Sequence, residues 1–403
     1  MKVCVVGSGG REHALAVVLG RHHEVVVTPG NPGIPGSVST PPEELAADLF
    51  VIGPEAPLVD GLADRLRATG RLVFGPGADG ARLEGSKAWM KDVLVEAGVP
   101  TAAHGTFTDT ASAFAFLDTM SVPYVVKTDG LAAGKGVVVT ESLAEARVAV
   151  ADYLSGEAFG DAGRTVVIEE GLTGPELSIL AICDGHRAVA LAPAQDYKRL
   201  GDGDSGPNTG GMGAYSPVPG AGPDVVDTVM RDAVEPTLAA LRTRGIDYRG
   251  VLYAGLMLTP DGPKVLEYNV RFGDPETQVV LPRLTSDLGA LLAAAARGHI
   301  DEPPTFDDGA AVTVVCAAEG YPRDVRTGDR IDGLAAAGAI AGVTVFCAGV
   351  AAGPEESLVT AGGRVLTVTG QAATIDEARE RAYAAVALVG WPGRHHRHDI
   401  ATG

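Results

Sequence analysis

The sequence predicts an α/β protein of several domains that begins with a parallel sheet. Near the start of the chain, short apolar runs at residues 2–6, 25–28 and 49–52 alternate with helical and turn-forming segments. This alternation is the pattern of βαβ units, which build parallel sheets. The chain has 403 residues, which is enough for about two or three domains.

The first domain is expected to span residues 1–100. Ser86 is the expected N-cap of its last helix, and Gly98 and Pro100 end that helix, because proline cannot continue a helix. This helix joins the first domain to the second. The other elements expected in the first domain are strand 2–6, helix 11–19 and strands 25–28, 49–52 and 72–74.

The second domain is expected to span residues 101–298 and the third residues 303–398. Thr374 and Glu377 have the spacing of a capping box, which starts the last helix. The strands expected in these two domains are 124–127, 136–140, 165–169, 177–183, 251–258, 311–317 and 363–369.

Charge and composition limit the classes of function. The formal net charge of −19 argues against a protein that binds duplex nucleic acid. No basic leader precedes the first strand, and no apolar run reaches the roughly 18 residues that a membrane helix needs. A cytoplasmic protein with no membrane partner is therefore expected. The cysteines are far apart and form no C-x-x-C pair, so we expect buried thiols at Cys4, Cys183, Cys316 and Cys347.

Residues 266–276 carry the most informative pattern in the chain. Glu267 and Asn269 are two residues apart on a strand-like run, so their side chains share one face. Arg271 and Asp274 follow closely. Two hard oxygen ligands beside a guanidinium suit a magnesium-bound polyphosphate. The alternative for this stretch alone is a half-buried strand that leads into a polar turn.

Three glycine-rich turns follow the first strands. The turn at residues 7–13 opens a helix, where backbone N–H groups can bind a phosphate. It is not a dinucleotide-binding fingerprint, because Glu12 stands where the third glycine is required. The turns at 29–33 and 53–58 follow the next strands. Since parallel strands end at one edge of a sheet, all three turns are expected to form a shared pocket there.

A fourth glycine-rich loop, at residues 127–136, lies between two strands. It is not a P-loop, because the spacing before Lys135 is one residue short and Gly136 replaces the required Ser or Thr. A strand-loop-strand flap with Lys127 and Lys135 at its ends can instead close over a triphosphate. The alternative is an ordinary glycine-rich hairpin.

Residues 195–215 are expected to line a substrate cleft. Asp196, Lys198 and Arg199 provide charge, and the glycines beside Met212 allow a small ligand to approach the backbone. A flexible surface loop is the alternative. The histidines at 395–398 lack the spacing of a zinc site, so a solvated tail is expected there.

Together these segments resemble the ATP-grasp superfamily and, within it, the phosphoribosylamine–glycine ligase family. The resemblance covers nearly the whole chain. It rests on six motifs in the family's order, at residues 9–13, 53–58, 83–87, 129–136, 206–215 and 271–276. It implies an N-terminal parallel-sheet domain, an ATP-grasp domain whose mobile flap subdomain spans about 120–188, and a small C-terminal α/β domain.

The resemblance also implies the reaction. ATP would phosphorylate the carboxylate of glycine, and the amine of 5-phosphoribosylamine would attack the acyl phosphate to give glycinamide ribonucleotide, ADP and phosphate, a step of purine biosynthesis. The implied cofactors are ATP and Mg²⁺ or Mn²⁺. The implied partners are these small molecules alone, and a monomer is expected.

The resemblance assigns roles to individual residues. Arg271, Asp274 and Lys135 would be catalytic, and Glu267 and Asn269 would bind the metal. ATP would contact Lys87, Lys127, Gly130, Gly134, Lys135, Gly136, Glu169, Glu170, Leu172, Glu176 and Lys198. The substrates would contact Gly9, Gly10, Arg11, Glu12, His13, Gly30, Asn31, Pro54, Glu55, Asp196, Gly211, Met212 and Gly213.

The sequence departs from the family pattern at three places. Residues 31–49 are shorter than expected, and Tyr197 stands where the family usually has His. The strand at 255–258 provides no acidic metal ligand, so water and phosphate would fill more of the coordination shell.

Three other functions stay open. One is an ATP-grasp ligase with a different acid or amine, and another is a non-catalytic nucleotide-binding sensor. The third, an NAD-dependent oxidoreductase, is disfavoured by Glu12 and by the lysine-containing flap.

Overall fold

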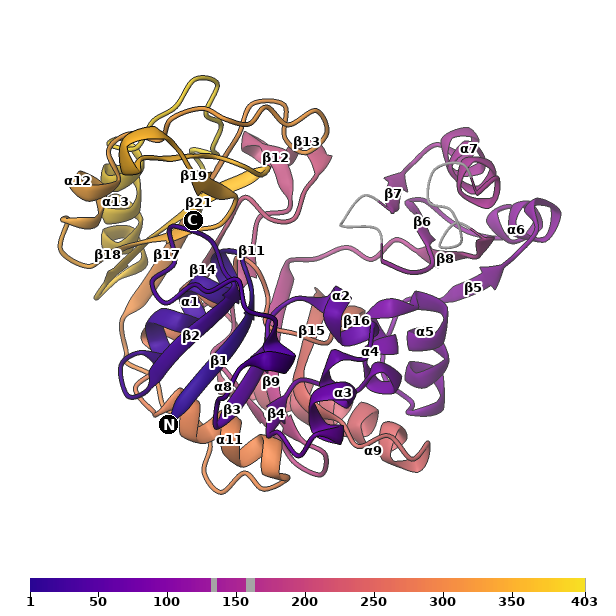
Figure 1. Ribbon diagram of the computed structural model, residues 1–403. Coiled ribbons are helices and arrows are strands. Elements are labelled where there is room, and N and C mark those ends of the chain that lie inside the picture. The colour runs from indigo at the N-terminus through magenta and orange to yellow at the C-terminus, as the bar shows by residue number, and fades with distance from the viewer. Residues whose placement is uncertain (132–135, 157–163, 403) are drawn as a thin grey trace.

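The computed structural model describes residues 1–131, 136–156 and 164–402. Gly134 and Lys135, two residues of the expected flap, lie outside the described residues. The first and last of the chain's sheets lie beside a central sheet, and a smaller lobe stands to one side of them (Figure 1).

The first sheet is parallel, as predicted, with the strand order β2-β1-β3-β4. Its strands are β1 (Lys2–Gly7), β2 (Glu24–Pro29), β3 (Leu49–Ile52) and β4 (Val73–Phe74). Its helices are α1 (Gly10–Leu19), α2 (Glu55–Val59), α3 (Leu62–Ala68) and α4 (Ala78–Gly85). The short segment between β2 and β3 contains one 3-10 turn, Pro42–Glu44, and a bridge from Ser37 to Val27.

Helix α5 (Lys87–Glu96) begins where the sequence predicts. The Ser86 side chain accepts a hydrogen bond from the backbone N–H of Trp89 at 3.1 Å. The other predicted cap is also present: Thr374 accepts from the N–H of Glu377 at 3.3 Å at the start of α13 (Ile375–Val386).

The lobe that stands apart is an antiparallel sheet covered by two helices (Figure 1). Its strand order is β5-β8-β6-β7. Its elements are β5 (His104–Phe107), α6 (Thr110–Leu117), β6 (Tyr124–Thr128), β7 (Val137–Thr140), α7 (Leu143–Leu154) and β8 (Val166–Glu170). It has its own apolar core, in which Val126, Val150 and Ile168 are fully buried.

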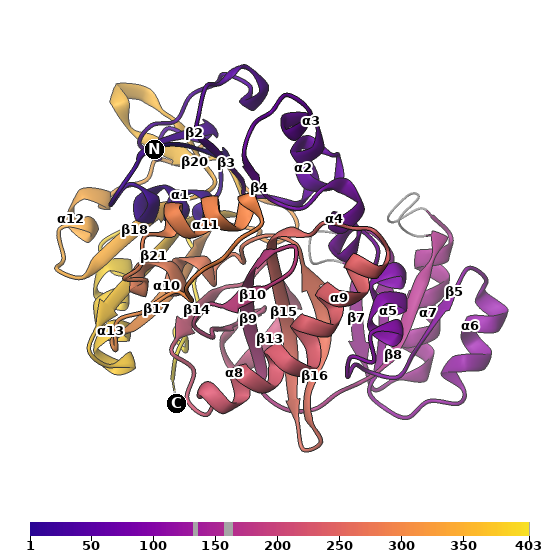
Figure 2. The ribbon, with the colours of Figure 1, turned by 90° about the horizontal axis from the view of Figure 1, so that it is seen from below.

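The central sheet is antiparallel, with the order β10-β9-β15-β16. Its strands are β9 (Glu176–Asp184), β10 (Ala188–Ala190), β15 (Arg249–Thr259) and β16 (Gly262–Asn269). Helices α8 (Pro223–Val229) and α9 (Glu235–Thr243), joined by the π-helical turn Met230–Val234, pack with α5 on one face (Figure 2). Helix α11 (Leu288–Arg297) and the first sheet cover part of the other face. The remainder of that second face carries polar side chains.

The last sheet has the order β11-β14-β17-β21-β18. Its strands are β11 (Gln195–Asp196), β14 (Gly213–Ser216), β17 (Ala310–Ala317), β18 (Val343–Cys347) and β21 (Arg364–Ala372). Strands β11 and β14 lie in the range expected for the second domain, but they join this sheet because β11 pairs with β14 and β14 pairs with β17. The smaller elements nearby are β12 (Arg199–Gly201), β13 (Ser205–Asn208), β19 (Val350–Ala352), β20 (Leu358–Thr360), α10 (Thr277–Val280) and α12 (Leu334–Gly338).

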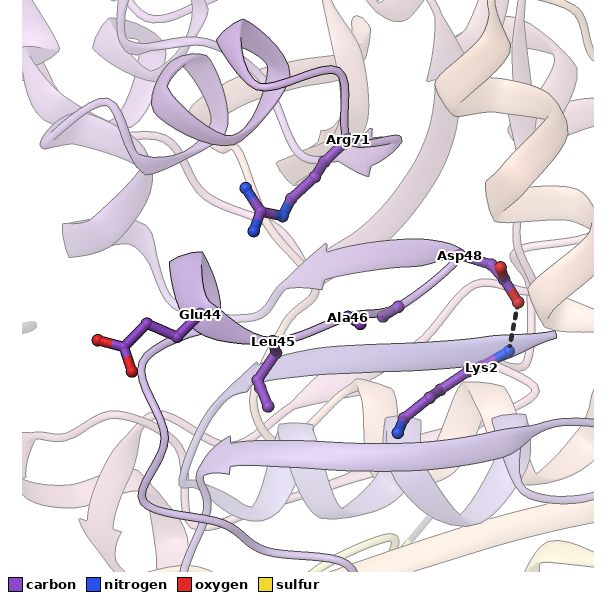
Figure 3. A pocket seen from close by; sticks show the side chains of 7 residues that line it. Lys2, Glu44, Leu45, Ala46, Asp48 and Arg71 are labelled. Atoms are coloured by element: carbon purple, nitrogen blue, oxygen red, sulfur yellow. Dashed lines mark hydrogen bonds between the residues drawn. The ribbon is translucent and has the colours of Figure 1, made fainter.

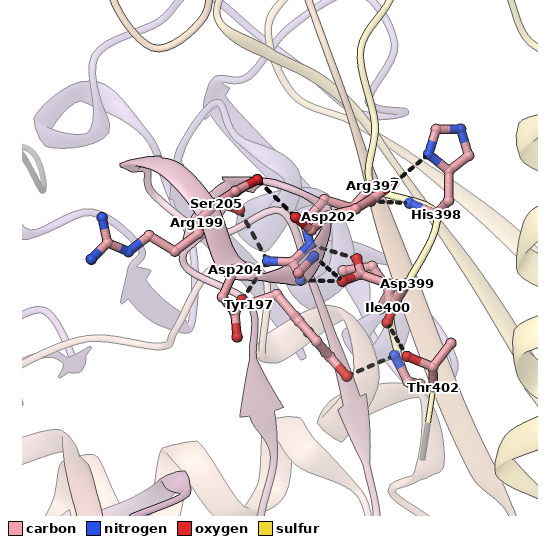
Figure 4. Close-up of polar contacts among 12 residues, drawn as sticks. Tyr197, Arg199, Asp202, Asp204, Ser205, Arg397, His398, Asp399, Ile400 and Thr402 are labelled. Atoms are coloured by element: carbon pink, nitrogen blue, oxygen red, sulfur yellow. Dashed lines mark hydrogen bonds and ion pairs between the residues drawn. The ribbon is translucent and has the colours of Figure 1, made fainter. Parts of the chain in front are cut away.

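The expectation of a solvated tail at residues 395–398 is wrong for Arg397. Its side chain is 1% exposed and forms ion pairs with Asp204 at 2.7 Å and Asp399 at 2.6 Å (Figure 4). Its guanidinium also lies 4.7 Å from the ring centroid of Tyr197. Two carboxylates and an aromatic face together offset the cost of burying this charge.

Two further findings concern the cysteines and the lengths of the helices. Cys4, Cys183, Cys316 and Cys347 are free and buried, as predicted. Within the part of the chain that the structure describes, no helix combines the length and apolar character that crossing a bilayer requires.

Candidate active site

One face of the central sheet brings together four residues expected at the site and two, Ser178 and Tyr253, that were not predicted. Opposed residues of antiparallel strands point to the same side. Gly255 opposes both Ser178 and Glu267, and Tyr253 opposes Asn269. Ala194 bridges to Ser178, which places Asp196 next to Glu176 on this face. The shared face therefore carries Glu176, Ser178, Asp196, Tyr253, Glu267 and Asn269.

Side chains of β15 and β16 alternate between the two faces of the sheet, and this alternation is interrupted at one irregularity in their pairing. Between Gly255 and Leu256 the register with β16 shifts, so that Leu266 is the extra residue. A bulge of this kind redirects side chains locally. Gly255 is also needed at this point, because a Cβ there would lie 3.2 Å from Cγ of Glu267.

Four cationic side chains surround Glu267. Lys198, Lys127, Lys87 and Arg271 lower the pKa of this carboxyl and outweigh the opposing effect of burial. Lys198 also pairs with Glu176. Glu267 is therefore ionised at neutral pH. Four cationic groups near one carboxylate, in a chain of net charge −19, suit a polyphosphate ligand.

Lys127 is held by a buried carboxylate. Its Nζ lies 2.9 Å from Oε1 of Glu169 and donates to the backbone oxygen of Leu266 at 3.1 Å. The other oxygen of Glu169 lies 3.0 Å from Nζ of Lys91. Glu169 is 1% exposed, so its side chain is used to position lysines. Any contact of residue 169 with adenine would have to come from its backbone.

Lys87 lies at the entry of the glycine-rich flap. Its Nζ donates to the backbone oxygen of Gly130 at 2.9 Å. Burial lowers the pKa of Lys87, and Glu267 opposes that effect. Gly130 has a φ of 85°, a left-handed conformation that favours glycine. Gly136, at the far end of the flap, is buried.

Arg271 connects the polar face to the first domain. Its guanidinium lies 2.9 Å from Glu84 and 3.3 Å from Glu55, and it donates to the side-chain oxygen of Asn269 at 3.1 Å. These carboxylates raise the pKa of Arg271 against the effect of burial. These ion pairs fix the side chain of Arg271 and bring the turn after β3 to the site.

The glycine-rich turns meet at one edge of the first sheet, as predicted, and Glu12 lies at their centre. Its carboxylate accepts from the N–H of Gly9 at 2.6 Å and from Nε of Arg11 at 2.5 Å. A Cβ on Gly53 would lie 2.1 Å from Oε1 of Glu12, and a Cβ on Gly7 would lie 2.5 Å from its Cγ. Arg11 in turn donates to the backbone oxygen of Phe272 at 3.2 Å. The side chains of Arg11 and Glu12 thus organise this edge of the sheet.

Two further residues of this edge contact the C-terminal domain. The side-chain amide of Asn31 donates to the backbone oxygens of Ser8 at 2.8 Å and Ala348 at 3.1 Å. Nδ1 of His13 accepts from the N–H of Cys347 at 2.8 Å, and burial lowers the pKa of His13 to about 4. His13 is therefore neutral, and its ring packs against Phe346.

Asp274 is held by a residue that the sequence did not indicate. Arg364, from β21, lies 3.2 Å from Oδ2 of Asp274 and donates to the backbone oxygens of Asp274 and Gly210. Gln278 donates to the other carboxylate oxygen at 2.8 Å. Arg364 lowers the pKa of Asp274 despite burial. Only the fold could reveal Arg364, because it lies 90 residues beyond Asp274.

The remaining predicted residues lie around these groups. Met212 is buried, and the N–H of Gly211 donates to the hydroxyl of Thr209 at 3.0 Å. Tyr197 points away, because its hydroxyl accepts from the N–H of Ala401 at 2.9 Å. Glu170 accepts from the N–H of Ala103 at 3.0 Å. The structure places Gly30, Pro54 and Leu172 at half-buried positions and Gly10 and Gly213 at buried ones.

A separate pocket lies away from these residues. It is lined by Lys2, Leu45, Asp48 and Arg71 at the amino ends of the first-sheet strands, opposite the edge with the glycine-rich turns (Figure 3). Asp48 closes one side by accepting from the backbone N–H of Lys2 at 2.8 Å. None of the predicted site residues lines it.

The fold is that of the ATP-grasp class of enzymes. It combines a parallel N-terminal sheet, an antiparallel sheet whose strand β16 carries Glu267 and Asn269, and a lobe that carries Lys127. Three family models match successive parts of the chain: the phosphoribosylglycinamide synthetase N domain at 1–84, its ATP-grasp (A) domain at 85–277 and its C domain at 311–403. The chain therefore belongs to the phosphoribosylamine–glycine ligase family. It is an ATP-dependent ligase that forms a carbon–nitrogen bond.

Individual relatives agree over the full length. Phosphoribosylamine–glycine ligase of Streptomyces coelicolor is 49% identical and that of Brucella melitensis 48% identical, over 100% and 99% of this chain and 99% and 97% of those proteins. The crystal structure of the Thermotoga maritima enzyme matches with a TM-score of 0.89 and 37% identity, over 100% of both chains. Biotin carboxylase of Campylobacter jejuni shares the fold, with a TM-score of 0.74 at 14% identity over 98% of this chain and 92% of that one.

Proposed function

We propose that the polar face of the central sheet is where glycine is activated by ATP and joined to 5-phosphoribosylamine. One oxygen of the glycine carboxylate attacks the γ-phosphorus of ATP, and ADP leaves. The amine nitrogen then attacks the carbonyl carbon of glycyl phosphate, inorganic phosphate leaves, and the nitrogen loses a proton. The observation that carries the proposal is the convergence of Lys87, Lys127, Lys198 and Arg271 on Glu267.

ATP would lie between this face and the lobe. Lys127 and Lys87 sit where its phosphates would pass, because Lys127 reaches the backbone of Leu266 and Lys87 reaches Gly130. Glu169 orients Lys127 from behind. Preorganised ammonium groups stabilise charge on a transferring phosphoryl group without reorganising during the reaction. Residues 170, 172 and 176 follow on the same connection and would meet the adenosine part.

A divalent cation, Mg²⁺ or Mn²⁺, would be held by Glu267 and Asn269. The donor set fits, since both are oxygen ligands on one strand face and Glu267 is ionised. When bound, the cation would neutralise charge on the phosphates. Among the described residues no group of three or more His, Cys, Asp and Glu side chains could hold a metal, so phosphate oxygens and water would complete the shell.

The phosphoribosylamine would approach from the edge of the first sheet. Backbone N–H groups at the start of α1 suit its phosphate, and Glu12 holds the turn in shape by binding Gly9 and Arg11. Asp274, fixed by Arg364 and Gln278, lies next to this edge: a Cβ on Gly9 would lie 3.6 Å from its Oδ2. An ionised carboxylate there can orient the attacking amine.

The test is a steady-state assay of ADP release. Release should require both glycine and 5-phosphoribosylamine and should saturate with each. A nucleotide-binding sensor would bind ATP and show no such dependence, and that result would reject the proposal. A different preferred amine or acid would instead indicate another ATP-grasp ligase. We also propose that the protein acts as a monomer in the cytoplasm and binds no nucleic acid, in keeping with its net charge of −19.

A further inference from the structure

Glu276 has a buried carboxylate oxygen without a partner. The residue is 2% exposed. Its Oε1 accepts from the hydroxyl of Tyr253 at 2.7 Å, and that hydroxyl also lies 2.8 Å from Oγ of Ser178. Its Oε2 is buried and makes no hydrogen bond within the described chain. A buried, unpartnered carboxylate oxygen is costly, so it calls for a functional explanation.

This oxygen belongs to the substrate side of the polar face. Tyr253 and Ser178 lie on that face by register, and the hydrogen bond to Tyr253 places Glu276 over the same end. Asp196 lies there as well, and Glu276 is the strongest of the acidic neighbours that, together with burial, raise the pKa of Asp196 to about 8. The described residues offer the carboxylate of Asp196 no hydrogen bond, although Lys198 partly balances its charge.

We propose that Glu276 and Asp196 form the subsite for the ammonium group of glycine. This inference rests on the proposed function. The zwitterion of glycine has a carboxylate that must face the phosphates and an ammonium that needs acceptors. An ammonium has three donors. The free oxygen of Glu276 can accept from it, and its positive charge would favour the ionised, accepting form of Asp196. The cation-rich end, around Glu267, would take the carboxylate and the phosphoryl group.

The segment that carries Glu276 is closely packed. A Cβ on Gly273 would lie 2.3 Å from Oε2 of Glu276 and 2.9 Å from Tyr253, so the backbone already presses against the carboxylate. Gly211 has a φ of 103°, and a Cβ there would lie 2.6 Å from Pro275. The neighbouring backbone therefore holds the carboxylate of Glu276 in place.

Glu276→Gln tests the inference with little change of shape. The amide oxygen of Gln can still accept from Tyr253, while the negative charge is lost. The dissociation constants of glycine and of acetate are measured by calorimetry, with a non-hydrolysable ATP analogue and Mg²⁺ present. Asp224→Asn, at an exposed position in the first turn of α8, is the matched control for net charge.

The inference predicts that Glu276→Gln weakens glycine binding by about tenfold to a hundredfold, the range for loss of a charge-assisted hydrogen bond. Acetate lacks the ammonium, so its binding should change by less than about twofold. Equal losses for both ligands would show a general structural effect and would overturn the inference. Unchanged glycine binding would overturn it too.

The two hypotheses fail differently. If the unaltered protein shows no glycine-dependent ADP release, the proposed function fails. If that release is normal and the KM of glycine is the same in Glu276→Gln, only the ammonium subsite fails. Tyr253→Phe, which removes the hydrogen bond that orients Glu276, should raise the KM of glycine and leave the KM of ATP unchanged.

Discussion

Glu169→Gln is expected to destabilise the protein and weaken ATP binding together. Glu169 is the shared partner of Lys91 at 3.0 Å and Lys127 at 2.9 Å, and the side chains of Lys91 and Glu169 are 0% and 2% exposed. Burial already lowers the pKa of Lys91 to about 8, against the effect of Glu169. Neutralising Glu169 leaves two buried ammonium groups without their carboxylate.

The magnitude follows from this burial. Removing one partner of a buried ion pair costs about 3 to 5 kcal/mol. At roughly 2–4 °C per kcal/mol for a domain of this size, the midpoint of thermal unfolding should fall by about 10 °C. The KM of ATP should rise by about tenfold, since Lys127 loses the group that orients it toward the backbone of Leu266.

Differential scanning calorimetry and steady-state kinetics provide the assays. In the calorimetry, Glu170→Gln is the matched control, because its contact with Lys264 is 3.7 Å long and both side chains are partly exposed. It should cost less than about 1 kcal/mol. In the double variant with Lys91→Met, part of the stability should return while the KM of ATP stays high. A Glu169→Gln protein as stable as the Glu170→Gln control would refute the reasoning.

Two further predictions follow from the same geometry. The Glu267→Gln variant should keep the fold, because this side chain serves ligands on the polar face and is not part of a hydrophobic core. The activity of the variant should require about tenfold more Mg²⁺. An unchanged dependence of activity on Mg²⁺ would reject the metal assignment. The pKa of His13 falls from 6.5 to about 4 in the folded protein, so the unfolded chain takes up a proton between those values that the folded protein does not. The free energy of unfolding should therefore decrease as pH falls from about 6.5 to about 4, and His13→Gln should show a weaker decrease in acid titrations followed by circular dichroism.

The sequence predicted the elements and the arrangement of the site better than its contacts. The pairing of Glu267 with Asn269 on one face follows from the two-residue period of a strand, and the meeting of the glycine-rich turns follows from parallel topology. Both depend on local pattern. The N-caps at Ser86 and Thr374 were likewise found from neighbouring residues.

The missed features depend on contacts between distant segments. Arg364 reaches Asp274 because Thr369, on the same strand β21, binds the backbone oxygen of Gln278 and brings β21 beside the turn at Asp274. The side chain of Arg397 is buried instead of solvated because Asp204 and Tyr197, about 200 residues earlier in the chain, are its partners. Glu276 stood in a motif as one carboxylate among several, and its free oxygen is visible only when its neighbours are placed. The secondary-structure propensities of residues and the spacing within motifs do not indicate which distant segments will pair.

The central claim, that glycine is activated as its acyl phosphate on the polar face, can be tested by isotope transfer. Glycine labelled with ¹⁸O in both carboxylate oxygens is incubated with ATP, Mg²⁺ and 5-phosphoribosylamine, and the inorganic phosphate is analysed by mass spectrometry. If the carboxylate attacks the γ-phosphorus, one labelled oxygen passes from glycine to phosphate in each turnover. Phosphate that contains no label while glycinamide ribonucleotide accumulates would contradict the account.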